Sequence, residues 1–271
     1  MTFQAYVDAA PVVWRGGEHF SSHRAIPEEV PVALTYDGSS YAVMMATPLD
    51  LRDFAIGFSL SEDVIDTPED IDSLEIIEVE GGIEARMWLK PHASNRERAR
   101  RRSVLGPTGC GLCGTESIAQ ALKPVRQLAS RFTIEPGELM SAMDALQKQQ
   151  SLNAKTRAVH AAGLYARGAV TVREDAGRHN ALDKVLGAVM SAGVAAEESV
   201  VLLTSRVSVE LVQKTARLGA PIIAAVSAPT ALAVRVAGSA GITLAAIVRG
   251  DGFEVFTYPE RIVERAHTDV R

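Results

Sequence analysis

Cysteine is scarce in this sequence: the 271 residues include only two, Cys110 and Cys113, and both lie in one C-x-x-C. A single pair so close together excludes the disulfide framework of a small secreted domain. Long apolar runs are also missing, since no stretch approaches the roughly 18 residues that a membrane helix needs. The first residues lack a basic start followed by an apolar stretch, so we expect no signal peptide. We therefore predict a cytoplasmic protein without a membrane span.

The charge is close to balanced, with 28 lysines and arginines against 33 aspartates and glutamates. A net charge of −5 gives no global positive field, and we therefore expect no nucleic acid as a partner. Apolar residues make up 47% of the chain, as in ordinary globular proteins. The length allows one large domain or two modest ones.

The N-terminal third predicts short strands and one helix. Asp50 stands where it could cap a helix over 51–60, because an acidic side chain can accept hydrogen bonds from the first free N–H groups. Apolar stretches that flank turn-forming residues predict two hairpins. The predicted hairpins join 32–36 to 41–46 and 74–79 to 83–89.

From about residue 160, apolar strands alternate with helices. The strands at 200–203 and 222–226 are apolar throughout, which is typical of a sheet covered by helices on both faces. The run 253–258 alternates instead, and predicts an antiparallel edge strand. The predicted order is strand 169–173, helix 180–190, strand 199–204, helix 207–218, strand 221–226, helix 230–238 and strand 242–248.

The composition changes sharply between 91 and 115. Five arginines lie within 96–102, and a glycine-rich loop follows them. We interpret the arginine run as a solvated charged loop, with a docking patch for an acidic partner or a cofactor as the alternative. Further helices are predicted over 115–122 and 136–150. We divide the chain into an N-terminal α+β part, 1–114, and an α/β domain, 115–271.

The loop at 109–114 reads Gly-Cys-Gly-Leu-Cys-Gly. A reactive cysteine needs its thiolate form, which nearby cations and helix N-termini favour. The sequence supplies arginines just before this loop and a predicted helix just after it. The flanking glycines remove side-chain bulk and let a large partner approach the backbone. These features favour reactive cysteines over structural ones.

Four other interpretations of the loop compete with this one. A structural zinc site needs about four ligands, and neither a second C-x-x-C nor histidines at diagnostic spacing are present. A zinc deaminase needs a His-x-Glu before its cysteines, whereas His160 comes after them and is followed by two alanines. The loop also satisfies G-x-G-x-x-G, but no apolar strand precedes it and Pro124 ends the following helix early. A buried, inert cysteine pair is the fourth.

The cysteine loop resembles that of the FdhD family of formate dehydrogenase accessory sulfurtransferases. The resemblance runs from about 30 to 258, and its most specific stretch is 175–184, Asp-Ala-Gly-Arg-His-Asn-Ala-Leu-Asp-Lys. Other stretches that resemble the family follow in the expected order: 54–62, 156–162, 205–208 and 226–230.

This resemblance implies a sulfur carrier that takes sulfur from a cysteine desulfurase. It implies that Cys110 bears the persulfide, that Cys113 assists, and that the acceptor is the molybdenum bis(molybdopterin guanine dinucleotide) cofactor of formate dehydrogenase, with no tightly held metal of the carrier's own. It also implies a deaminase-like three-layer mixed sheet in the second half and makes a homodimer plausible. The residues expected to contact the cofactor are Ile247, Val248, Arg249, Gly250, Asp251 and Gly252. The alternative function is a non-catalytic chaperone that binds the cofactor or formate dehydrogenase.

Polar residues follow three of the predicted strands, where open α/β sheets usually bind ligands. The segment after 169–173 carries Arg178 and His179, and the segment after 199–204 carries Ser205 and Arg206. Their plain alternatives are helix caps, by Asn180 and by serine, with Asp183 as a first-turn charge and Lys184 as an ion-pair partner. Thr230 is expected to cap the next helix, and 249–252 has the composition of a turn. These strand ends form a guanine-nucleotide pocket only if they converge.

Overall fold

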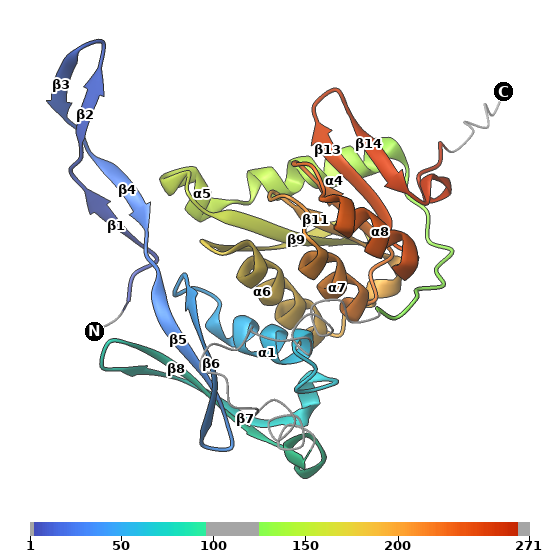
Figure 1. The fold of residues 1–271 in the computed structure, drawn as a ribbon, viewed down its shortest axis with the longest axis horizontal. Helices are drawn as coiled ribbons and strands as arrows, with labels where there is room; N and C mark the ends of the chain where they lie inside the picture. The colour runs from blue at the N-terminus through green and yellow to red at the C-terminus, as the bar shows by residue number, and fades with distance from the viewer. Residues whose placement is uncertain (1–2, 96–124, 265–271) are drawn as a thin grey trace.

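The computed structural model describes residues 3–95 and 125–264 (Figure 1). The arginine run, the cysteine loop, the predicted helix over 115–122 and the predicted domain boundary lie outside the described residues.

A β-ribbon and a four-stranded sheet make up the N-terminal part. The ribbon consists of two antiparallel pairs, β1 with β4 and β2 with β3, and extends away from the body of the protein (Figure 1). The sheet has the order β6-β5-β8-β7, and α1 packs on one of its faces. The elements are β1 (Tyr6–Ala9), β2 (Val12–Arg15), β3 (Glu18–Ser21), β4 (Arg24–Pro27), β5 (Val30–Tyr36), β6 (Ser39–Ala46), α1 (Leu51–Ser61), η1 (Pro68–Asp70), β7 (Ile71–Val79) and β8 (Gly82–Leu89).

Both predicted hairpins and the predicted helix are confirmed, but the cap is wrong. Asp50 has φ 52° and makes no side-chain capping bond. Its carboxylate instead lies 3.6 Å from the guanidinium of Arg173. The Asp50 side chain, which the local pattern predicted to cap the helix, therefore forms a long-range ion pair instead.

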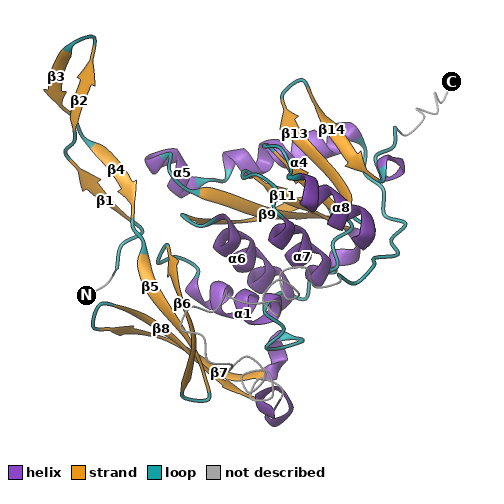
Figure 2. Ribbon diagram, in the orientation of Figure 1, coloured by secondary structure: helices purple, strands orange, loops and turns teal. Residues whose placement is uncertain are grey.

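The C-terminal part is a mixed six-stranded sheet with the order β10-β9-β11-β12-β13-β14. Figure 2 shows helices on both sides of this sheet. The strands β11, β12 and β13 are parallel, while β14 is the predicted antiparallel edge strand. The strand β9, which lies between β10 and β11, was not predicted. The elements are α4 (Pro136–Lys148), α5 (Ser151–Thr156), β9 (His160–Ala166), β10 (Ala169–Asp175), α6 (Arg178–Ser191), η2 (Ala196–Glu198), β11 (Ser199–Leu203), α7 (Val209–Leu218), β12 (Ile222–Ala225), α8 (Ala231–Ala240), β13 (Thr243–Arg249), β14 (Gly252–Thr257) and η3 (Pro259–Arg261).

Helices cover both faces of this sheet, which confirms the predicted three-layer α/β architecture. On one face, α6, α7 and α8 bury side chains such as Leu182 and Leu211 against Val201. On the other face, α4 buries Leu139 and Leu146 against the same strands. Successive side chains of β11 therefore point to opposite faces of the sheet and pack in two separate apolar cores.

The helices α1 and α6 cross at two glycines, which join the two parts of the protein. A Cβ atom on Gly57 would lie 1.7 Å from the carbonyl oxygen of Asp183, and one on Gly187 would lie 1.9 Å from that of Asp53. Both values are far inside van der Waals contact, and the obstructing atoms are backbone. The close crossing therefore requires glycine on both helices.

We expect Gly187→Ala to lower the free energy of unfolding by about 3 kcal/mol, at the upper end of overpacking costs, because neither backbone can yield easily. Urea unfolding followed by circular dichroism measures this. The matched control is Gly137→Ala in α4, where a Cβ meets nothing within 4 Å. That change is expected to stabilise the helix by at most about 1 kcal/mol. Equal stability of the two variants would contradict the tight crossing.

Candidate functional site at the carboxyl edge of the sheet

The carboxyl ends of four strands lie on one edge of the six-stranded sheet. Since β10 and β11 both run antiparallel to β9, they share a direction, and β12 and β13 are parallel to β11. The segments that follow these strands carry the residues predicted to bind a ligand. Open α/β sheets commonly bind ligands at this edge.

Direct contacts join three of these segments. His179 Nε2 lies 3.5 Å from the Ser208 hydroxyl, which links the start of α6 to the start of α7. The next link is a backbone pair, in which Val207 N–H donates to the Ala228 carbonyl at 3.3 Å and Thr230 N–H donates to the Val207 carbonyl at 3.0 Å. The segments after β10, β11 and β12 therefore form one continuous surface.

The predicted turn at 249–252 is confirmed and lies further along the same edge. It joins β13 to β14, with Arg249 paired to Gly252 in the ladder. A register shift precedes it, and Ile247 has φ 56° there. Val248 is buried in the core, so only its backbone is available to a ligand.

The predicted polar residues differ in exposure. Arg206 and Arg249 are exposed, and Arg178 and His179 are half-buried. Ser205 is buried, and its hydroxyl donates to the Arg206 carbonyl at 3.1 Å. The arginines therefore face the surface of the edge, while Ser205 shapes the loop beneath them.

Thr230 caps α8 as predicted, but two other predictions for helix ends are wrong. The Thr230 hydroxyl accepts a hydrogen bond from Ala233 N–H at 3.2 Å. Asn180 does not cap α6, because the helix already begins at Arg178 with Gly177 at the N-cap. Asp183 is not a first-turn surface charge either, since it is buried in the second turn.

Two histidines at this edge are electrostatically coupled to Arg178. Burial lowers the pKa of His179, and the charges of Arg178 and Lys214 lower it further. Burial also lowers the pKa of His160 at the start of β9, again with help from Arg178. Because both pKa values lie below the ordinary value of about 6.5, both imidazoles are neutral at pH 7. The positive charge at this edge therefore comes from the arginines.

A cavity of about 460 Å³ lies beside the edge, between α1, α6 and α7. His179 and Glu210 stand on its wall, as do Asp183 and Lys214. The Lys214 ammonium contacts both oxygens of Asp183 at 2.6 and 2.7 Å, and the Ser61 hydroxyl donates to the same carboxylate at 2.5 Å. The charges of Asp183 and Lys214 therefore neutralise each other within this wall.

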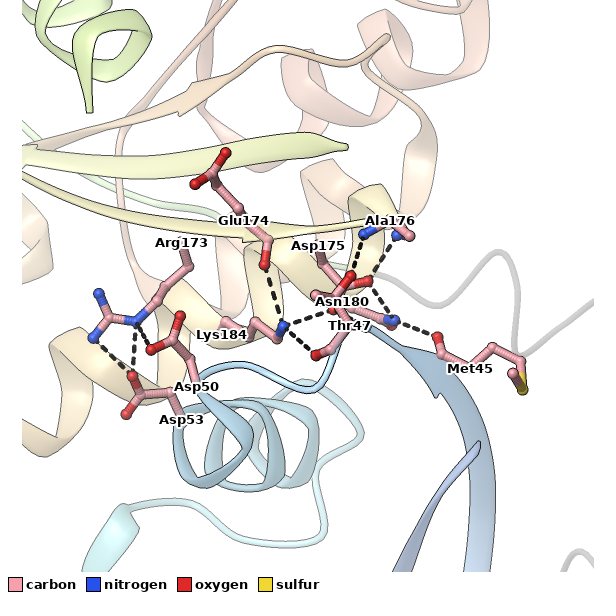
Figure 3. Close-up of polar contacts among 11 residues, drawn as sticks. Met45, Thr47, Asp50, Asp53, Arg173, Glu174, Asp175, Ala176, Asn180 and Lys184 are labelled. Atoms are coloured by element: carbon pink, nitrogen blue, oxygen red, sulfur yellow. Dashed lines mark hydrogen bonds and ion pairs between the residues drawn. The ribbon is translucent and has the colours of Figure 1, made fainter. Parts of the chain in front are cut away.

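A buried polar network lies behind the start of α6 (Figure 3). The Lys184 ammonium lies 2.7 Å from the Asp175 carboxylate, and both side chains are fully buried. It also donates to the carbonyls of Thr47 and Glu174 at 3.0 and 3.2 Å. Burial lowers the pKa of Lys184, while Asp175 acts to raise it. Lys184 thus forms an ion pair, as predicted. Its partner, Asp175, lies at the end of β10, outside the helix that carries Lys184.

The network includes Thr47, which sequence reasoning missed. It follows β6 in the N-terminal part, about 130 residues away from Asp175, so no local spacing connects the two. The acidic pair Glu174-Asp175, which comes just after the predicted strand 169–173, was the sequence feature that could have pointed to this network.

Among residues 3–95 and 125–264, no group of three or more His, Cys, Asp or Glu residues is arranged to hold a metal ion. No helix in this part of the chain is long and apolar enough to cross a membrane.

The fold matches that of a solved structure. A protein from Desulfotalea psychrophila, described as a candidate formate dehydrogenase accessory protein, superimposes with a TM-score of 0.75 at 26% identity. The match covers 96% of this chain and 100% of that one.

The family model named FdhD/NarQ family matches residues 27–263. The chain belongs to the FdhD/NarQ family. A relative from Agrobacterium fabrum, named sulfur carrier protein FdhD, is 50% identical over 96% of this chain and 97% of its own. A protein of the same name from Cupriavidus necator is 50% identical over 93% and 88% of the two chains.

Proposed function

We propose that this chain is a sulfur carrier in the maturation of formate dehydrogenase. The observation that supports it is the 50% identity, over nearly the whole chain, to relatives named sulfur carrier protein FdhD. A protein that carries sulfur as a persulfide needs a cysteine, and this sequence offers only Cys110 and Cys113. The partners of this function are a cysteine desulfurase as donor and the catalytic subunit of formate dehydrogenase. In this proposal the sulfur transfer takes place in the cytoplasm, and the protein can act as a homodimer.

The proposed chemistry is a sulfurtransferase cycle in two exchanges. The Cys110 thiolate attacks the outer sulfur of the desulfurase persulfide, so that the S–S bond of the donor breaks and its cysteine leaves as a thiolate. The Cys113 thiolate then attacks the Cys110 sulfur and releases hydrosulfide to the acceptor. This step leaves a disulfide between the two cysteines, which a thiol reductant returns to two thiols.

The proposed acceptor is the molybdenum bis(molybdopterin guanine dinucleotide) cofactor, bound as a substrate at the carboxyl edge. Arg178 and Arg206 suit its diphosphates, because a guanidinium can bind phosphate oxygens through two hydrogen bonds. The helices α6 and α7 begin at the same edge, and helix N-termini favour anions. The turn 247–252 extends this surface to Arg249.

Sulfur carriage is tested by the intact mass of the protein after incubation with a cysteine desulfurase and cysteine. We expect the addition of one sulfur atom, which a thiol reductant removes. A protein that gains no sulfur under conditions in which the desulfurase itself is loaded would contradict the proposal.

Cofactor binding is tested with guanosine diphosphate as the probe. We expect Arg178→Ala combined with Arg206→Ala to weaken binding at least about tenfold, because each hydrogen bond to a charged group contributes about 1.5–3 kcal/mol. Isothermal titration calorimetry measures this. The matched control is Arg167→Ala, which lies in the β9–β10 turn at the opposite edge of the sheet. Absence of binding, or equal binding by the double variant, argues against this part of the proposal.

A further inference from the structure

The N-terminal part of the protein holds the turn that precedes α6. All three polar groups of Thr47 contribute (Figure 3). Its N–H donates to Asp175 Oδ2 at 3.1 Å, and its hydroxyl accepts from Ala176 N–H at 3.1 Å. Its carbonyl accepts from the Lys184 ammonium at 3.0 Å. Thr47 is fully buried, so water cannot replace these bonds.

The Asp175 carboxylate continues the same connection into the helix. Its Oδ1 accepts from Gly177 N–H at 2.7 Å and from the Asn180 amide at 3.1 Å. The Asn180 amide also donates to the Met45 carbonyl at 2.8 Å, which lies in β6. The turn and the first helical residues are therefore bonded both to β6, through Met45, and to Thr47 just after it.

This connection fixes the turn immediately before α6, ahead of the positions that a helix cap would bind. The N-cap residue Gly177 has no side chain, and so α6 has no side-chain cap. The N–H groups of Ala176 and Gly177, which come just before the first helical residue, are bonded by Thr47 and Asp175. Arg178 and His179 follow at once, so their placement depends on contacts made by residues of another sheet.

We propose that Thr47 is a positioning residue for the ligand-binding edge: through Ala176 and Asp175, the N-terminal part sets where Arg178 and His179 stand. This inference rests on the proposed binding of a guanine nucleotide at that edge. Because coupling between two equilibria is reciprocal, a ligand that engages Arg178 also favours the docked position of β6. The two parts of the protein thus act together in binding, although Thr47 does not touch the ligand.

The test compares Thr47→Val with Thr47→Ser. Valine keeps the volume and the backbone bonds but removes the acceptor of Ala176 N–H, whereas serine keeps the acceptor. With guanosine diphosphate as the probe, we expect calorimetry to show affinity about tenfold weaker for valine and near wild type for serine, in the usual range of coupling between sites. We also expect faster hydrogen exchange of the 176–179 amides in the valine variant.

Two further variants separate positioning from general loss of stability. Thr243→Val removes an equally buried hydroxyl, which donates to the Tyr258 carbonyl at the opposite end of β13. We expect it to lower the melting temperature without changing nucleotide affinity. Asn180→Ala cuts the bond to Met45 and is expected to weaken binding as Thr47→Val does, which keeps the test open should the valine variant fail to fold.

The outcomes distinguish this inference from the proposed function. Binding by wild type that is unchanged in Thr47→Val and Asn180→Ala overturns the positioning role and leaves the function intact. An equal loss of affinity in Thr243→Val also overturns it, because the effect is then one of stability. If wild type does not bind the probe, the cofactor part of the proposed function fails, and this inference fails with it.

Discussion

Replacing Cys110 by alanine is expected to abolish the uptake of sulfur completely. In the proposed cycle Cys110 accepts the sulfur and Cys113 only releases it, so the variant retains no residue that takes sulfur from the donor. After incubation with a cysteine desulfurase and cysteine, the variant should keep its original intact mass while wild type gains one sulfur atom. In cells that carry only this variant, formate dehydrogenase activity should fall to the level found without the carrier.

Cys113→Ala is the matched variant for this experiment. It removes the thiol proposed to release the sulfur, so we expect the protein to load one sulfur atom and to retain it longer than wild type. Normal maturation of formate dehydrogenase with Cys110→Ala would exclude the carrier and favour the alternative, a non-catalytic chaperone. Sulfur that loads on Cys113 alone would reverse the assigned roles of the two residues.

Replacing Lys184 by methionine is expected to lower the free energy of unfolding by about 3–5 kcal/mol, the usual cost of leaving a buried charge without its partner. The ammonium is fully buried, and the Asp175 carboxylate that it pairs with is also inaccessible to water. Urea unfolding at neutral pH measures the loss. Besides the unpaired Asp175 carboxylate, the carbonyls of Thr47 and Glu174 lose the ammonium that donates to them, which adds to the loss of stability.

Two controls define the origin of this effect. Arg86→Met breaks the more exposed pair with Glu84, and it is expected to cost at most about 1 kcal/mol. Adding Asp175→Asn to Lys184→Met removes the unpaired charge and keeps an oxygen to accept from Gly177 N–H and the Asn180 amide, and we expect it to restore part of the lost stability. A cost for Lys184→Met no larger than that for Arg86→Met would show that the buried pair does not join the two parts of the protein.

The buried pair and the glycine crossing act on the same helix. One face of α6 carries Gly187 against α1, and the neighbouring face carries Lys184 against β6 and β10. The two glycines allow α1 and α6 to pack closely, and the hydrogen bonds of Lys184 fix the position of α6 relative to the end of β6. The half-buried start of α6, with Arg178 and His179, is consequently held in place where the proposed ligand binds.

The ribbon that precedes β5 was within reach of sequence reasoning. Gly16 and Gly17 form a two-residue turn with positive φ between β2 and β3, which is a strong hairpin signal. The strand β9 was not within reach, since its Ala-Ala-Gly sequence has weak strand propensity. Gly163 serves there because a Cβ would lie 3.0 Å from Leu146 of α4, so packing of a distant helix explains the residue.

The sequence by itself determined the alternation of strands and helices, the antiparallel last strand and the cap at Thr230. Each of these depends on neighbours within a few residues, where periodicity and side-chain chemistry act directly. Only the tertiary structure decided that the ends of β10 to β13 share one edge, that Asp50 serves Arg173 and that Thr47 holds the start of α6. The contacts of Asp50 and Thr47 join residues more than 100 positions apart, and the segments after the strands meet only through the pairing of the sheet, so no local pattern contains either.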